Sequence, residues 1–369
     1  MKAYKNLIVN ACISLKTCLY LLWLHVEKSR RESMNKQTVT IYDVAREAEV
    51  SMATVSRVVN GNTNVKPSTR EKVMKVIEKL DYRPNAVARG LASRRTTTVG
   101  VIIPDITNLY FSSFALGIDD IAAMYDYSII MANADQGREE KVVTDILSRQ
   151  VDGLVYLGHT MTDKIRHEVE RTRTPIVLAG MIDPEGKMPS VHIDYESAVA
   201  EAVSRLFDQG IEDVAFISAP EYQVDDELGR FNGYKKALAS HNKDLDSALC
   251  LTAENSRYRA AEEVGQELID SKAQAAMIIG DELAAGVSNY VQDKGLKVPE
   301  DISIVSSNNS IITEIVRPQL TTIAPPLYDI GAVAMRILTK LMGDKSVEEE
   351  VIENKNILPY KIIVRDSTK

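Results

Sequence analysis

Residues 51–60 carry side chains whose types and spacing suit contact with the bases of DNA. Three valines recur at i, i+3 and i+4, so they should form the buried face of a short helix. The opposite face then presents small and cationic groups, and an arginine there can bind guanine through two hydrogen bonds. The residues expected to reach base edges are Met52, Ala53 and Arg57, with Arg57 as the expected guanine contact.

Two short helices with a tight break between them must position that face. Thr40 can cap a first helix together with Asp43, and Ser51 can cap the second. The break falls at 49–50, and Asn60-Gly61 stops the second helix. This pattern predicts a helix-turn-helix, whose second helix lies in the DNA major groove. Contacts with phosphates and sugars are expected from Tyr42, Ser51, Thr54 and Asn60.

A third helix and a local excess of positive charge complete this head. Ser68-Thr69-Arg70-Glu71 has the form of a capping box, and apolar residues follow at helical spacing. Residues 34–95 hold 12 Lys and Arg against 6 Asp and Glu, whereas the whole chain has a net charge of -8. The head is therefore +6 and the remainder -14, an asymmetry suited to phosphate binding. Charge alone would also fit any three-helix bundle with a basic face.

The helix-turn-helix sequence resembles the LacI/GalR family of bacterial repressors. The matching residues are Asp43-Val44-Ala45, Ala48, Val50-Ser51 and Thr54-Val55-Ser56-Arg57-Val58-Val59-Asn60. The family usually has glycine where this chain has Glu49, a departure that lowers stability if φ is positive there. The resemblance implies a homodimer that binds a pseudo-palindromic operator.

A short segment at 83–97 joins the head to the rest of the chain. Pro84 suits the first turn of a helix, but a helix this short is marginal in water. From the residues alone it is either an interdomain linker or a helix that folds on DNA. The resemblance implies a hinge helix that adds Ala88 and Leu91 to the DNA interface, with Leu91 inserted into the minor groove.

A second signature lies near the C-terminus, at 328–340. Arg336 and Lys340 are four residues apart, so both cations lie on one helix face, with Tyr328 on roughly the same side. Such a pair can bind a phosphate, but it is also the ordinary basic edge of an amphipathic helix. Here the chain is similar, over residues 38–369, to the carbon catabolite control branch of the family. That resemblance implies docking of the serine-phosphorylated phosphocarrier HPr as corepressor at Tyr328, Asp329, Arg336, Thr339 and Lys340.

The body of the chain alternates short apolar runs with helical segments from Thr98 onward. Regular alternation of this kind predicts an α/β fold with doubly wound parallel sheets. The resemblance implies a two-lobed core like that of the periplasmic binding proteins. We expect one lobe from 98–194 with 309–324, and the other from 195–308 with 325–369.

A ligand of such sheets binds beyond the carboxyl ends of the strands. The candidates for an effector cleft are Asp105, Arg230, Asp281 and Asn308. Asp281 can equally be a helix cap. Family members commonly have aspartate at the position of Asn308, so the loss of charge argues against tight binding of a free sugar. No cofactor is expected, although a sugar-phosphate co-effector remains open.

Residues 1–33 fall outside the family pattern. Their apolar stretch is a signal peptide, a weak membrane helix or an upstream extension of the reading frame, and Lys16 within it argues against a membrane span. The extension is the preferred interpretation, with translation starting at Met34. Three cysteines and five histidines show neither a disulfide framework nor metal-ligand spacing, and no catalytic triad stands out. We expect a cytoplasmic protein that is not an enzyme.

Three functions compete at this point. The leading one is a DNA-binding transcriptional regulator of carbon catabolite repression or activation. The second is a LacI-type repressor of a single sugar or nucleoside operon, controlled by a small molecule. The third is an exported sugar-binding transport component, against which the helix-turn-helix argues.

Overall fold

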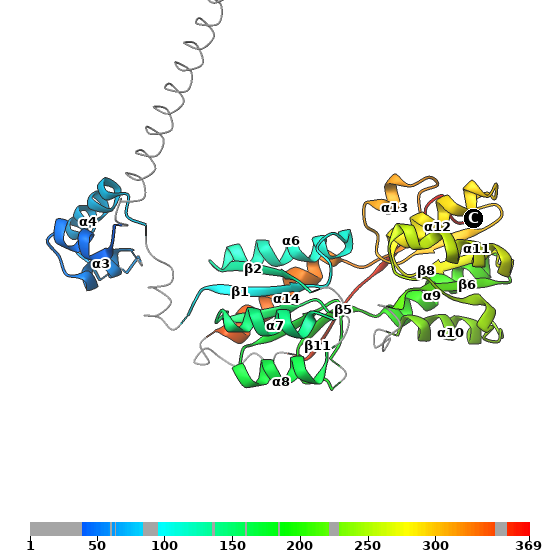
Figure 1. Ribbon diagram of the computed structural model, residues 1–369, viewed down its shortest axis with the longest axis horizontal. Helices are drawn as coiled ribbons and strands as arrows, with labels where there is room; N and C mark the ends of the chain where they lie inside the picture. Colours follow the sequence, from blue (N-terminus) through cyan, green and yellow to red (C-terminus); the bar gives the residue numbers. More distant parts are fainter. Residues whose placement is uncertain are drawn as a thin grey trace, which may run out of the picture. The chain divides into compact units, whose positions relative to one another are not determined.

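The computed structural model describes residues 39–59, 61–62, 64–83, 95–134, 137–158, 161–183, 185–220, 229–343 and 353–369. The chain divides into two compact units, 1–92 and 93–369. The first unit holds the helical head, and the second holds the α/β body (Figure 1). None of the helices in the described ranges has the length and apolar character needed to cross a bilayer. The apolar stretch within 1–33 lies outside these ranges.

The head consists of α2 (Ile41–Glu47), α3 (Met52–Val59) and α4 (Pro67–Leu80). Its small core is made of alanines and valines from all three helices, and Val44, Ala48 and Val55 are completely buried. The prediction that Ser68 caps the third helix is wrong. The helix begins two residues earlier because Pro67 occupies its first position, where the missing N–H is harmless, and Lys66 is the cap residue.

The body contains two six-stranded sheets, each covered by helices on both faces (Figure 1). The first lobe has the strand order β11-β5-β4-β3-β1-β2, and all of its strand pairs are parallel. Helices α6 and α14 pack on one face of this sheet, and α7 and α8 pack on the other. These elements are β1 (Thr98–Ile103), α6 (Leu109–Met124), β2 (Ser128–Asn133), α7 (Glu139–Ser148), β3 (Gly153–Tyr156), α8 (Asp163–Thr172), β4 (Ile176–Ala179), β5 (Ser190–Ile193), α14 (Leu327–Met342) and β11 (Lys355–Leu358).

The second lobe has the strand order β12-β10-β9-β8-β6-β7, with only β12 antiparallel to its neighbour among the described strands. Helices α9 and α10 cover one face, and α11 and α12 the other. Its elements are α9 (Tyr195–Asp208), β6 (Val214–Ser218), α10 (Arg230–Ser240), β7 (Cys250–Thr252), α11 (Ala261–Ser271), β8 (Ala275–Ile278), α12 (Asp281–Asp293), β9 (Ser303–Ser306), α13 (Ile312–Ile315), β10 (Thr321–Ala324) and β12 (Lys361–Ile363).

The predicted assignment of residues 309–324 to the first lobe, and of the segment directly after them to the second, is wrong. Residues 309–324 stay in the second lobe, because β10 pairs with β9 and α13 packs on α12. The chain then returns to the first lobe with α14, pairs β11 with β5, and ends in the second lobe with β12. The chain therefore passes between the lobes after β5, after β10 and after β11 (Figure 1). Several connections of this kind are typical of a hinged pair of lobes with a cleft between them.

Candidate nucleic-acid interface and interlobe cleft

The outer face of α3 carries the side chains predicted to contact DNA. Met52, Ala53 and Arg57 are exposed, whereas Val55 and Val58 are buried in the head. At the start of the helix, the backbone N–H of Thr54 donates to the Ser51 Oγ at 3.2 Å. The predicted cap is thus confirmed, and it fixes the direction in which the helix leaves the turn.

The turn before α3 is strained at Glu49, the position where the family usually has glycine. Glu49 has a φ of 50°, in the left-handed region that glycine adopts without steric conflict. Its carboxylate accepts a hydrogen bond from the Lys72 Nζ at 2.8 Å, and this contact lowers the pKa of Glu49. The ion pair ties the turn to α4, so the side chain partly compensates for its own backbone conformation.

Acidic side chains of the head are paired away from α3. Glu47 binds Lys79 at 2.7 Å, and Asp43 binds Arg46 at 2.7 Å while accepting from the N–H of Thr40. No acidic side chain in the described part of the head pairs with Arg57. Its guanidinium is therefore available to an anionic or hydrogen-bonding ligand.

The remaining predicted DNA contacts are placed only in part. Tyr42 is 65% exposed at the start of α2, which suits a phosphate contact. Ser51 and Thr54 share a hydrogen bond between their hydroxyl groups at 2.9 Å. Asn60, Ala88 and Leu91 lie outside the described residues.

The predicted docking residues lie on α14, and four of them are exposed on its surface. Tyr328, Asp329, Arg336 and Lys340 are exposed, whereas Thr339 is half-buried and donates its hydroxyl to the Arg336 carbonyl. Within the described ranges no carboxylate pairs with Arg336. The basic pair predicted from the spacing thus occupies one accessible helix face.

Helix α14 is held against α6 by two glycines. A Cβ added to Gly117 would collide with the Tyr328 carbonyl, and one added to Gly331 would collide with the Phe114 carbonyl. The Tyr328 hydroxyl donates to the Asp120 Oδ2 at 2.8 Å, and this bond raises the pKa of Tyr328. Close backbone approach and this hydrogen bond make the two helices one rigid platform. Asp120 was not anticipated, since nothing local in the sequence links it to Tyr328.

Asp281 is buried at the carboxyl end of β8, where the cleft was expected. Its carboxylate accepts from the backbone N–H of Asn308 at 3.1 Å and of Ser310 at 2.6 Å. Burial raises the pKa of Asp281, and these two hydrogen bonds oppose the rise. The residue is the first of α12, whose cap is Gly280, so Asp281 neither caps its own helix nor projects freely into a cleft. It holds the loop that follows β9.

The other two predicted cleft residues are also engaged within the chain. Arg230 is buried at the start of α10, with its guanidinium carbon 4.1 Å from the centroid of the Tyr195 ring. Asp105 forms an ion pair with Arg257, a residue that the sequence did not single out. Asp281 and Asn308 line one small cavity between the lobes, but Asp105 and Arg230 are not among its lining residues.

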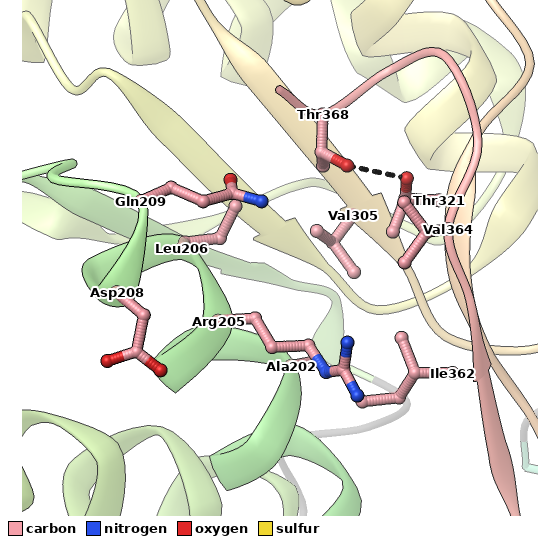
Figure 2. A pocket seen from close by; sticks show the side chains of 10 residues that line it. All are labelled: Ala202, Arg205, Leu206, Asp208, Gln209, Val305, Thr321, Ile362, Val364 and Thr368. Carbon is pink, nitrogen blue, oxygen red and sulfur yellow. Dashed lines mark hydrogen bonds between the residues drawn. The ribbon is translucent and has the colours of Figure 1, made fainter.

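A larger pocket lies in the second lobe, between α9 and the C-terminal strand (Figure 2). It measures about 250 Å³ and lies at the C-terminal end of α9. Its charged rim groups have partners: Arg205 pairs with Glu201 at 3.0 Å, and Asp208 approaches the His241 ring nitrogen at 3.3 Å. Ligands of open α/β sheets bind at the opposite edge, so the interlobe cleft remains the better candidate effector site. No cluster of three potential metal ligands occurs in the described ranges.

Head and body together define a class of bacterial regulator. Residues 40–85 match the family model described as bacterial regulatory proteins of the lacI family, and residues 203–368 match that of a periplasmic binding protein-like domain. The chain belongs to the lacI family. The resemblance seen in the helix-turn-helix is therefore confirmed, as is the α/β fold with two parallel-sheet lobes.

Particular relatives are similar over nearly the whole chain. Catabolite control protein A of Streptococcus mutans is 50% identical over 336 residues, which cover 90% of this chain and 98% of that protein. The Staphylococcus epidermidis protein of the same name is 48% identical over 335 residues, covering 90% and 100%.

Two solved structures support the same assignment. The transcription regulator CcpA of Lactococcus lactis is 42% identical, with a TM-score of 0.68 over 74% of this chain and 100% of that one. The lac repressor dimer bound to operator and an anti-inducer is 25% identical, with a TM-score of 0.78 over 90% and 99%.

Proposed function

We propose that this chain is a DNA-binding transcriptional regulator of carbon catabolite control that acts as a homodimer on a pseudo-palindromic operator. In this proposal, serine-phosphorylated HPr is the corepressor and docks on α14. The relatives named catabolite control protein A and the exposed face of α3 support the regulatory role. The observation that carries the corepressor is Arg336, which is exposed and pairs with no carboxylate among the described residues, on a helix platform built with α6.

Dimer formation is supported by a related structure of the lac repressor, which is a dimer bound to operator. Two copies would bring two α3 helices to the two half-sites of a palindrome, about one DNA turn apart.

A phosphoserine would fit the α14 surface for an electrostatic reason. The phosphate carries about two negative charges and three acceptor oxygens, and a guanidinium can bind it through two hydrogen bonds. Tyr328 and Lys340 lie on the same exposed face as Arg336 and would contact the surrounding partner surface. Asp329 would contact a basic group of the partner.

The test is a pair of titrations with fluorescently labelled operator DNA and purified HPr. Phosphorylated HPr should tighten operator binding by about 5- to 150-fold, and operator should tighten phosphorylated HPr binding by the same factor, because coupling is reciprocal. Equal operator affinity with and without the phosphoprotein would contradict the proposed corepressor.

The Arg336→Ala variant tests the docking face itself. It should weaken binding of phosphorylated HPr by at least about 10-fold, since a charge-assisted contact contributes more than about 1.4 kcal/mol. Arg149→Ala, on the exposed end of α7, removes the same charge elsewhere on the first lobe and should leave binding unchanged. Equal losses in the two variants would contradict a specific site on α14.

A further inference from the structure

Between the two lobes, the described residues enclose one small cavity. The cavity bounded by Asn108 and Tyr110 of the first lobe and by Asp281 and Asn308 of the second measures about 10 Å³. A pocket for a small molecule usually measures about 300–1,000 Å³, and about 10 Å³ has room for roughly one water molecule. This cavity therefore has no room for a sugar while the lobes keep their present separation.

Arg257 spans the interlobe cleft. It belongs to the second lobe, just before the short helix η3 (Tyr258–Ala260). Its Nη2 donates to the Thr107 Oγ1 at 2.9 Å and forms an ion pair with Asp105, both in the first lobe. Its Nη1 lies 3.2 Å from the Glu282 Oε2 of its own lobe. One guanidinium thus lies between two carboxylates that belong to different lobes.

Both ends of this bridge are held by local backbone geometry. The Asn255 side chain accepts from the Arg257 N–H at 3.0 Å and fixes the loop that carries the arginine. On the other side, the Asp105 Oδ1 accepts from the N–H and the hydroxyl of Thr107, at 2.8 and 2.7 Å. The partners are therefore largely pre-ordered, which lowers the entropy lost when the bridge forms.

The bridge ends on the loop that leads into α6. Asn108, one residue after Thr107, accepts from the N–H of Tyr110 and caps that helix. The same α6 carries Asp120, which binds Tyr328 on α14. One continuous helix therefore connects the loop that holds the bridge with the surface proposed to dock the corepressor.

We propose that Arg257 is an internal substitute for a cleft ligand, which keeps the lobes closed without a small-molecule effector. This inference rests on the proposed function, since it specifies how that regulator is controlled. With Arg257 in place the closed state is already populated, so the signal comes from the docked phosphoprotein and not from a sugar in the cleft. Removal of either side of the bridge shifts the lobes toward an open state.

The lobe separation can be measured directly by electron–electron distance spectroscopy. One spin label would be placed on exposed Lys141 of α7 and the other on exposed Glu263 of α11, after replacement of the three native cysteines by serine. In the full-length protein without DNA, HPr or sugar, the wild-type distribution should show one dominant closed distance. Arg257→Gln and Asp105→Asn should each lower the closed-to-open ratio by about 5-fold, as expected for a partly exposed ion pair.

A double variant and a matched control complete the experiment. Arg257→Gln with Asp105→Asn should open the lobes no further than Arg257→Gln alone, because that single substitution already removes the ion pair with Asp105. Arg259→Gln removes an exposed arginine of η3 and should leave the distances unchanged. Identical distributions for wild type and both single variants, or additive shifts in the double variant, would overturn the proposal. Since no DNA or HPr is present, failure of the proposed corepressor would not change this readout.

Discussion

The outer face of α3 and the interlobe cleft both carry polar side chains where a ligand is expected, but those side chains differ in what they already bind. On α3, Arg57 is exposed, and no carboxylate pairs with it in the described part of the head. In the cleft, Asp281 accepts hydrogen bonds from two backbone N–H groups, and Asp105 is paired with Arg257. The α3 face can therefore bind a new partner directly, whereas the cleft must first break internal bonds.

This difference explains which surface is suited to sense a signal. Separating Asp105 from Arg257 exposes both charges to water and loses a charge-assisted bond, so a ligand of the cleft must compensate for that loss. The α14 surface has no such cost at Arg336, which already faces solvent without a partner in the described ranges. A macromolecular corepressor on α14 is therefore a better match to this chain than a small molecule in the cleft.

The largest effect is expected at Asp281, which holds the loop that follows β9. Asp281→Ala should lower the free energy of unfolding by about 2–4 kcal/mol, because two backbone N–H groups lose a charged acceptor in a buried site. Urea denaturation of the full chain measures this change. The same substitution at exposed Asp293, at the other end of α12, is the control and should change stability by less than about 0.5 kcal/mol. Unchanged stability in Asp281→Ala would contradict the structural role and favour a role in binding a ligand, one of the two roles that the sequence left open.

A smaller effect, on binding alone, is expected at Arg57. Arg57→Ala should weaken operator binding by 5- to 150-fold, about 1–3 kcal/mol, and should relax the preference at one base pair. The free energy of unfolding should not change, because the side chain is exposed. Tyr42→Phe is the useful comparison, since loss of a phosphate contact should weaken all operator sequences equally. An equal loss on every operator with Arg57→Ala would assign that residue to the backbone of DNA.

The same contrast decides how much could be predicted from the sequence. The exposed face of α3 was predicted correctly, because a helix fixes the directions of side chains three and four residues apart whatever the rest of the chain does. The alternation of strands and helices in the body was likewise predicted from local apolar runs. The bridge between Asp105 and Arg257 joins residues 152 positions apart, and no local pattern indicates it.

The lobe assignment of the C-terminal segments was predicted wrongly for a similar reason. A strand shows its own existence through its apolar residues, but the sheet it joins depends on pairing with distant strands. β10 and β11 are both short, and their sequences do not reveal that one pairs with β9 and the other with β5. Only the three-dimensional pairing shows that α14, and with it the proposed docking face, belongs to the first lobe.

The smallest predicted effect concerns Glu49, whose ion pair with Lys72 partly offsets the strain of its own backbone. Glu49→Gly removes the steric conflict at φ 50° but also the ion pair with Lys72, so the head should melt roughly 2–4 °C higher at neutral pH. Lys72 lowers the pKa of Glu49 in the folded state, so the ion pair stabilises the head above the unfolded pKa near 4.5 and is lost as the pH falls. The advantage of glycine should therefore be greatest below pH 4. Glu49→Gln keeps the strained backbone and loses the charge. Its melting temperature should be lower than that of the wild type at pH 7 and equal to it at pH 3. If the glycine variant melted lower than wild type at both pH values, the turn would not be strained, and α3 would be positioned without cost.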